Sequence, residues 1–118
     1  MNAMQQKVAT IKRTIERLIC SIRKKDQRFC ARMEIDYTDT MAQCLIETEP
    51  EKMWGYSEAD VDSNTVLVQL RFDGYAYEYF SYDGNMQSEG AWKLRKMLEK
   101  IGCSFEYYNS CSIDIYHC

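Results

Sequence analysis

Residues 65–82, TVLVQLRFDGYAYEYFSY, decide the fold class predicted from the sequence. Apolar and aromatic residues fill both halves of this stretch, as is typical of β-strands. The Asp73-Gly74 pair between the halves favours a type I′ turn, which needs positive φ at both central positions. The stretch therefore predicts a β-hairpin with Phe72 opposite Tyr75. Because both of its faces carry apolar residues, we expect the hairpin to lie centrally in an antiparallel sheet. The other expected cross-strand pairs are Leu67 with Phe80 and Gln69 with Glu78.

The C-terminal stretch, residues 103–118, predicts a second hairpin. A three-residue turn at 108–110 is preferred to a two-residue turn at 109–110, because only the longer turn brings the apolar residues of both strands to one face. Those residues are Cys103, Phe105, Tyr107, Cys111, Ile113 and Ile115. The outer face then carries Ser104, Glu106, Ser112, Asp114 and Tyr116.

Two amphipathic helices are expected. Over residues 4–28, apolar side chains recur at helical spacing and form one stripe. A second helix begins after Ser88, a favourable N-cap, and ends at Gly102, which suits the left-handed stop position. The stripe of the first helix consists of Val8, Ile11, Ile15, Leu18, Ile19 and Ile22. The stripe of the second consists of Ala91, Leu94, Leu98 and Ile101.

The segment between the first helix and the first hairpin is expected to contain two more strands. Residues 30–37 alternate between apolar and polar side chains, which indicates a half-buried strand. Residues 42–46 are interpreted as its hairpin partner, with a helix from Thr38 as the alternative. The capping-box spacing of residues 48–51 predicts one helical turn through Trp54. Residues 57–64 are expected to form an acidic loop.

These elements predict a single α+β domain over residues 1–118, with the order α-β-β-(short α)-β-β-α-β-β. We expect an antiparallel sheet of about four to six strands with two main helices on one face. No apolar run approaches the ~18 residues of a membrane span, and the N-terminal residues lack the pattern of a signal peptide. A cytoplasmic protein is therefore expected, and the sheet edges and tyrosine-rich faces leave a dimer open.

Catalytic and metal-binding patterns are sparse. The six cysteines contain no Cys-x-x-Cys pair, and the expected register separates Cys103 from Cys111 by about 13 Å, too far for one zinc ion. Residues 60–64 match the first half of a calcium loop, but Thr65 and Arg71 stand where glycine and glutamate are needed. We therefore expect no metal, no cofactor and no catalysis. An enzyme built on a cysteine and His117 is kept as a further hypothesis.

Charge is distributed very unevenly along the chain. The net charge is −3, but residues 1–33 hold nine basic and two acidic side chains, whereas residues 34–118 hold six basic and sixteen acidic ones. A basic helix is thus joined to an acidic body, an asymmetry that indicates a charged macromolecular partner.

Two candidate binding surfaces follow from this asymmetry. The first is an acidic segment with embedded aromatic residues, a combination typical of protein-binding hot spots. It consists of Glu47, Glu49, Glu51, Trp54, Tyr56, Glu58, Asp60 and Asp62. The alternative interpretation is a loop that Trp54 pins to the core. The second candidate is a basic strip on the first helix, roughly 22 Å long. It follows a nucleic-acid backbone, is a solvated helix face, or pairs with the acidic body of the same chain. It consists of Arg13, Arg17, Lys24 and Arg28.

At the level of size, charge and architecture, the chain resembles the compact inhibitors that phages and mobile elements direct at host defence enzymes, including anti-CRISPR proteins. It is similar in the same respects to secretion chaperones and toxin-immunity proteins. The local acidity and embedded aromatic residues of residues 47–62 favour a non-catalytic protein-binding module that blocks a basic, nucleic-acid-handling protein, as the resemblance also implies. A nucleic-acid-binding protein that uses the basic strip is the alternative.

Overall fold

A computed structural model of the chain describes residues 2–55, 65–83, 86–87 and 89–117. Its first element, α1 (Ala3–Met33), is longer than the predicted helix at both ends. Asn2 and Gln5 form a reciprocal capping box at its start, because the side chain of each accepts a hydrogen bond from the backbone N–H of the other. At its end, Glu34 adopts a left-handed conformation with φ of 55°.

The main sheet has four antiparallel strands in the order β1-β2-β6-β5. They are β1 (Cys44–Glu47), β2 (Val66–Phe72), β5 (Cys103–Asn109) and β6 (Ser112–His117). Strand β2 is central, as predicted, and pairs with β1 on one side and β6 on the other. Within the described residues, the α+β class and the antiparallel sheet are confirmed.

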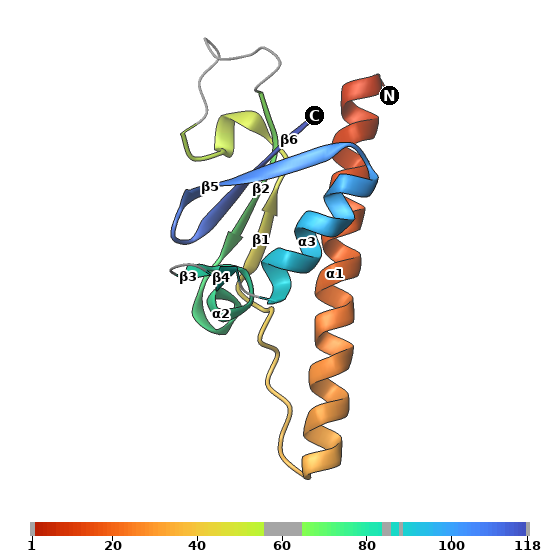
Figure 1. Cartoon of the computed structure of the whole chain (residues 1–118), viewed down its shortest axis with the longest axis vertical. Helices are drawn as coiled ribbons and strands as arrows, with labels where there is room; N and C mark the ends of the chain where they lie inside the picture. The colour runs from red at the N-terminus through yellow and green to blue at the C-terminus, as the bar shows by residue number, and fades with distance from the viewer. Residues whose placement is uncertain (1, 56–64, 84–85, 88, 118) are drawn as a thin grey trace.

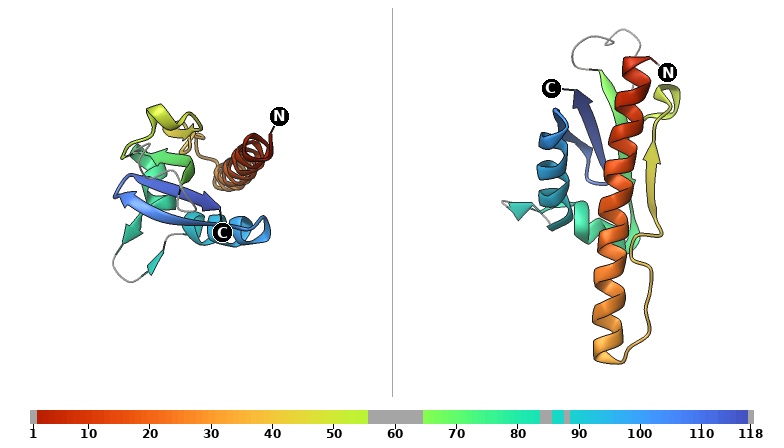
Figure 2. Two further views of the ribbon diagram at one scale, coloured as in Figure 1. Left: turned by 90° about the horizontal axis from the view of Figure 1, so that it is seen from above. Right: turned by 90° about the vertical axis from the view of Figure 1, so that its right-hand side faces the viewer.

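One face of this sheet carries the core and both main helices. Val68, Leu70 and Phe72 of β2 project to this face together with Ile113 and Ile115 of β6, and all five are buried. Helices α1 and α3 (Glu89–Lys100) pack on this side (Figure 1; Figure 2). The predicted stripes of both helices face the core, and Gly102 follows α3 with φ of +72°. Ser88, the predicted cap, lies outside the described residues.

The predicted strand at residues 30–37 is wrong. Residues 30–33 continue α1, because alanine, arginine and methionine have high helix propensity. Residues 35–39 then run back toward β1 without pairing to another described strand. The segment expected to pair with residues 30–37 does form a strand, β1, but β1 pairs with β2 instead. The alternative prediction, a helix from Thr38, is wrong.

Only the first half of the predicted hairpin at residues 65–82 is correct. After β2 the chain forms a 3-10 turn, η3 (Gly74–Ala76), and a short helix, α2 (Tyr77–Phe80). The side chain of Asp73 caps this turn through the backbone N–H of Gly74, and only Gly74 of the pair has positive φ. Because β1 and β6 occupy both edges of β2, no place is left there for a Tyr75–Tyr82 strand. A small ribbon, β3 (Tyr82–Asp83) and β4 (Met86–Gln87), then leads to α3.

The C-terminal hairpin has a different turn from the one predicted, and the predicted core facing is correct except at Cys111, which lies in the turn before β6. Phe105 lies opposite Ile115 and Tyr107 opposite Ile113, so these residues share the core face. The expected turn at 108–110 is wrong, because Asn109 already pairs with Ser112 across a register shift. The side chain of Asn109 accepts hydrogen bonds from the Cys111 N–H and the Ser112 hydroxyl, which fix a tighter turn. Two residues of the expected outer face, Ser112 and Asp114, are also buried.

The molecule is elongated because of α1. Its extents are 52 × 32 × 24 Å and its radius of gyration is 15.0 Å, against about 13.5 Å for a compact globule of this length. A 31-residue helix is about 46 Å long. The C-terminal part of α1 and the returning chain, residues 23–37, extend past the sheet, and we call this region the α1 tip (Figure 1). Both ends of the described chain lie at the opposite end of the molecule.

Candidate functional site

The acidic segment predicted from the sequence lies partly on the sheet face that the helices leave uncovered. Glu47 ends β1, and Glu49 and Glu51 belong to the 3-10 helix η1 (Pro50–Lys52) and its N-cap. This helix and Gly55, with φ of +74°, agree with the predicted single turn. Four of the predicted residues lie outside the described part of the chain: Tyr56, Glu58, Asp60 and Asp62.

A buried amide fixes Trp54 to the sheet. Gln69 of β2 is fully buried, and its Oε1 accepts a hydrogen bond from the Trp54 backbone N–H at 3.0 Å. Its Nε2 donates to the Trp54 carbonyl at 3.1 Å and to Asp114 Oδ1 at 2.7 Å. The neighbouring Met53 is buried as well. The backbone of this turn is therefore held in one position, since removing Gln69 would leave several polar groups unpaired.

The Trp54 ring itself remains accessible. About half of the residue is exposed, and the guanidinium of Arg71 stacks on its ring at 4.2 Å from the centroid. Arg71 also donates to Gln69 Oε1 and to the Lys52 carbonyl, so its side chain is fixed too. The alternative interpretation, in which Trp54 anchors this loop to the core, is therefore only partly correct. Met53 and the Trp54 backbone anchor the loop, whereas the indole faces outward.

Three carboxylates lie in one row across the sheet. The register aligns Glu47, Gln69, Asp114 and Glu106 across all four strands. Burial raises the pKa of Asp114, and nearby Glu106 adds to this effect. Glu49 is partly neutralised by Lys52 at 2.6 Å. With Glu51, the residues that the structure describes on this side of the sheet include five carboxylates and two basic side chains, Lys52 and Arg71.

We name this surface the acidic sheet face. It consists of Leu45, Glu47, Glu49, Glu51, Trp54, Glu106 and Tyr108. Sequence reasoning missed three of these residues, because Leu45, Glu106 and Tyr108 join Trp54 only through the sheet register and the turn at Gly55. A Cβ atom at Gly55 would lie 2.4 Å from the Tyr108 ring. The ring can occupy this position because glycine has no side chain. Leu45 and Tyr108 are each about half exposed.

The basic strip is exposed as the helical spacing predicts. Arg13, Arg17, Lys24 and Arg28 all lie on the side of α1 that faces away from the core. Glu16 interrupts it, because Glu16 lines the same shallow depression as Arg13 and Arg17. The two candidate surfaces thus lie on different elements, one on α1 and one on the open side of the sheet.

Two of the described cysteines, Cys103 and Cys44, are held as protonated or buried thiols. The register places Cys103 opposite His117, a pairing that sequence reasoning missed. Cys103 is buried, and its thiol donates to the Ile101 carbonyl at 3.8 Å. Burial also raises the pKa of Cys44 to about 11, so that thiol stays protonated at neutral pH. Among the described residues, no three His, Cys, Asp or Glu side chains come together as a metal site would require.

None of the described helices is both long and apolar enough to span a bilayer. In comparisons with known proteins, no family, no curated protein and no solved structure matches the chain. The inference of function therefore depends on the surfaces described above.

Proposed function

We propose that the chain is a non-catalytic binding module whose acidic sheet face docks on a basic surface of another protein. The observation that carries the proposal is the fixed position of Trp54. An indole that is exposed while its backbone is fastened by Gln69 loses little conformational freedom when it is buried by a partner. Tryptophan is also among the residues that contribute most to interface affinity.

The charge of the surrounding side chains supports a basic partner. Glu47, Glu51 and Glu106 surround the aromatic residues with negative charge, which attracts basic grooves and repels nucleic acid. Grooves of this kind are typical of proteins that handle nucleic acids. Occupying one would make the chain an inhibitor, as in the anti-CRISPR class; a chaperone or immunity protein would use such a face in the same manner.

The proposal is tested by affinity capture from an extract of the source cells, carried out in parallel with and without nuclease. The protein recovered is then titrated against two variants of the acidic sheet face. Trp54→Ala should weaken binding by about thirtyfold, the effect of losing a hot-spot residue. The pair Glu51→Lys and Glu106→Lys should also weaken binding and reduce its salt dependence.

The matched control reverses two exposed carboxylates elsewhere, Glu16→Lys and Glu99→Lys. This variant should bind as the unaltered chain does. Equal losses in the control and in the acidic-face variants would contradict the proposal. Recovery that disappears with nuclease, or with Arg13→Glu and Arg17→Glu, would instead favour the nucleic-acid hypothesis, which the exposure of the basic strip supports.

A further inference from the structure

Helix α1 carries its apolar face beyond the body of the protein. Its buried stripe ends at Ile22, and Phe29 and Met33 follow at helical repeats that return to the same side. Phe29 is nevertheless 48% exposed and Met33 55% exposed, and Ile35 just beyond the helix is exposed as well. Adjacent exposed apolar side chains on a small protein mark an interaction site.

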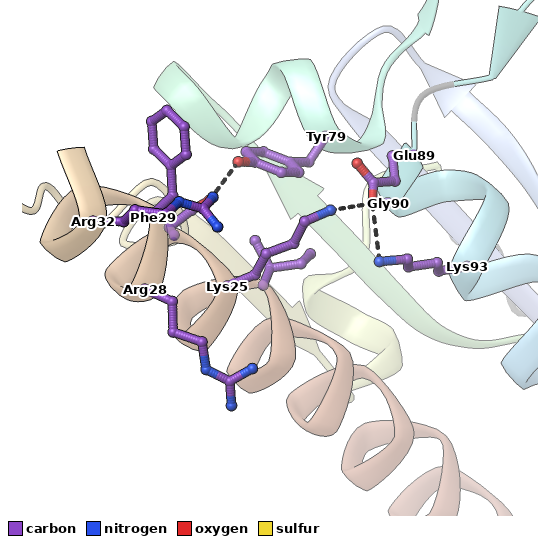
Figure 3. A pocket seen from close by; sticks show the side chains of 10 residues that line it. Lys25, Arg28, Phe29, Arg32, Tyr79, Glu89, Gly90 and Lys93 are labelled. Atoms are coloured by element: carbon purple, nitrogen blue, oxygen red, sulfur yellow. Dashed lines mark hydrogen bonds and ion pairs between the residues drawn. The ribbon is translucent and has the colours of Figure 1, made fainter.

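A pocket of about 480 Å³ opens beside Phe29, between α1, α2 and α3 (Figure 3). Ile22 and Phe29 line it from α1, Tyr79 from α2 and Gly90 from α3. Its volume lies within the usual range of ligand pockets and accommodates a bulky apolar side chain. The pocket and the exposed apolar residues form one continuous candidate surface, because Phe29 belongs to both.

Several charged groups in this pocket already have partners. Lys25 and Lys93 both bind Glu89, at 2.7 and 3.0 Å (Figure 3). The two oxygens of Asp26 accept hydrogen bonds from the Tyr79 hydroxyl at 2.9 Å and the Thr40 hydroxyl at 2.7 Å. These four charged groups are already paired and connect the walls of the pocket. We therefore expect a ligand to bind other groups.

Two arginines at the rim remain available. Arg28 and Arg32 both line the pocket, and neither reaches a carboxylate within the described chain. The Arg32 guanidinium lies 5.9 Å from the Phe29 ring centroid, so the cation is beside the apolar surface. A ligand for this site therefore combines an apolar group with carboxylates that pair with guanidinium.

The other possible occupants fit less well. A second copy that met this surface tip to tip would bring Arg28 and Arg32 against their own counterparts, which is unfavourable. Nucleic acid would gain from the arginines, but Met33 and Ile35 offer nothing to a phosphate backbone, and Asp26 and Glu89 would repel it.

We propose that the α1 tip binds an acidic peptide segment of another protein, with a bulky apolar side chain of that segment seated against Phe29 and its carboxylates on Arg28 and Arg32. The site is separate from the acidic sheet face and has the opposite charge preference. The chain would then join two proteins, a basic one and an acidic one.

The test uses fluorescent synthetic peptides titrated against the full chain by polarisation. The probe carries leucine and phenylalanine at helical spacing on a glutamate background. Its comparison peptides have the same composition with the apolar residues dispersed, or lysine in place of glutamate. We expect the probe to bind at least about tenfold more tightly than either comparison peptide. Phe29→Ala should weaken its binding about tenfold, and Arg28→Ala with Arg32→Ala should weaken it and flatten its salt dependence.

The control variant is Arg13→Ala with Arg17→Ala, which removes the same charge from α1 far from the tip and should leave affinity unchanged. Because Phe29 is exposed, its variant should keep its thermal unfolding curve; Met33→Ser provides a second variant of the apolar surface. The proposal is overturned if the dispersed peptide binds equally well or if the control matches the tip variants. Tighter binding of single-stranded DNA than of the probe, or oligomers of the chain alone in light scattering, would also overturn it.

Discussion

Gln69 shows how much one side chain organises in this molecule. Its amide connects Trp54, Asp114 and Arg71 and is fully buried. The sequence predicts β2 around it correctly, yet pairs Gln69 with Glu78, because the Asp73-Gly74 signal implies a hairpin. A local turn signal carries no information on which distant strands occupy the two edges of β2, and these strands decide what Gln69 meets.

Asp114 permits a prediction at the scale of a single residue. Because burial raises its pKa above the ordinary 3.8, the protonated form favours folding, and this contribution is lost as pH rises through the folded pKa. Asp114→Asn keeps an oxygen to accept from Gln69 and removes the charge. It should raise the free energy of unfolding at pH 7 by about 0.5–2 kcal/mol, as stabilising substitutions do.

Urea unfolding of both proteins at pH 7 and at a pH well below 3.8 checks this expectation. The advantage of Asp114→Asn should disappear at the lower pH, where the wild-type carboxyl is protonated in both states. A variant less stable than wild type at pH 7 would show that Gln69 needs the carboxylate charge.

At the scale of elements, the periodic segments are the predictable ones. Both amphipathic helices, β2, the C-terminal strands and the turn at η1 follow from spacing and capping signals in the sequence. The strand at 30–37 fails because residues 30–33 include good helix formers that continue α1, and residues 35–37 pair with no strand in the described part of the chain. Only part of the acidic sheet face could be predicted. Trp54 and the neighbouring glutamates are close together in the sequence, whereas Glu106 and Tyr108 belong to β5 and reach this surface only through the sheet.

The contact between α2 and α3 depends on a glycine. Gly90 is buried, and a Cβ atom there would lie 2.4 Å from the Tyr79 carbonyl oxygen and 3.2 Å from the Phe80 ring. Although alanine has the higher helix propensity, we expect Gly90→Ala to destabilise the protein by about 1–3 kcal/mol, because the two helices must separate. Thermal or urea unfolding measures the change.

The comparison for that measurement is Ser21→Ala at an exposed position of α1. This variant should change the free energy of unfolding by less than about 0.5 kcal/mol. If Gly90→Ala is as stable as Ser21→Ala, α2 is free to move away from α3, and the pocket beside Phe29 is adjustable.

At the scale of the whole molecule, α1 packs against the folded body along its middle and extends past the sheet at its C-terminal end. Residues 11–22 contain its buried positions, whereas residues 28, 29 and 31–33 are all exposed. Hydrogen exchange of α1 should therefore be graded, with amides of residues 29–33 exchanging at least about tenfold faster than those of residues 11–22. Exchange monitored by NMR at several protein concentrations measures this gradient. Uniform protection along α1 would mean that another copy covers the tip in solution.

The position of the two ends of the chain has a practical consequence for handling the protein. Both ends of the described chain lie at the end of the molecule opposite the α1 tip (Figure 1). A tether at either terminus therefore presents the tip toward the surrounding liquid when the protein is attached to a bead or a sensor chip. Immobilisation through a lysine of α1 would instead orient the helix toward the support and obstruct the surface meant to be measured.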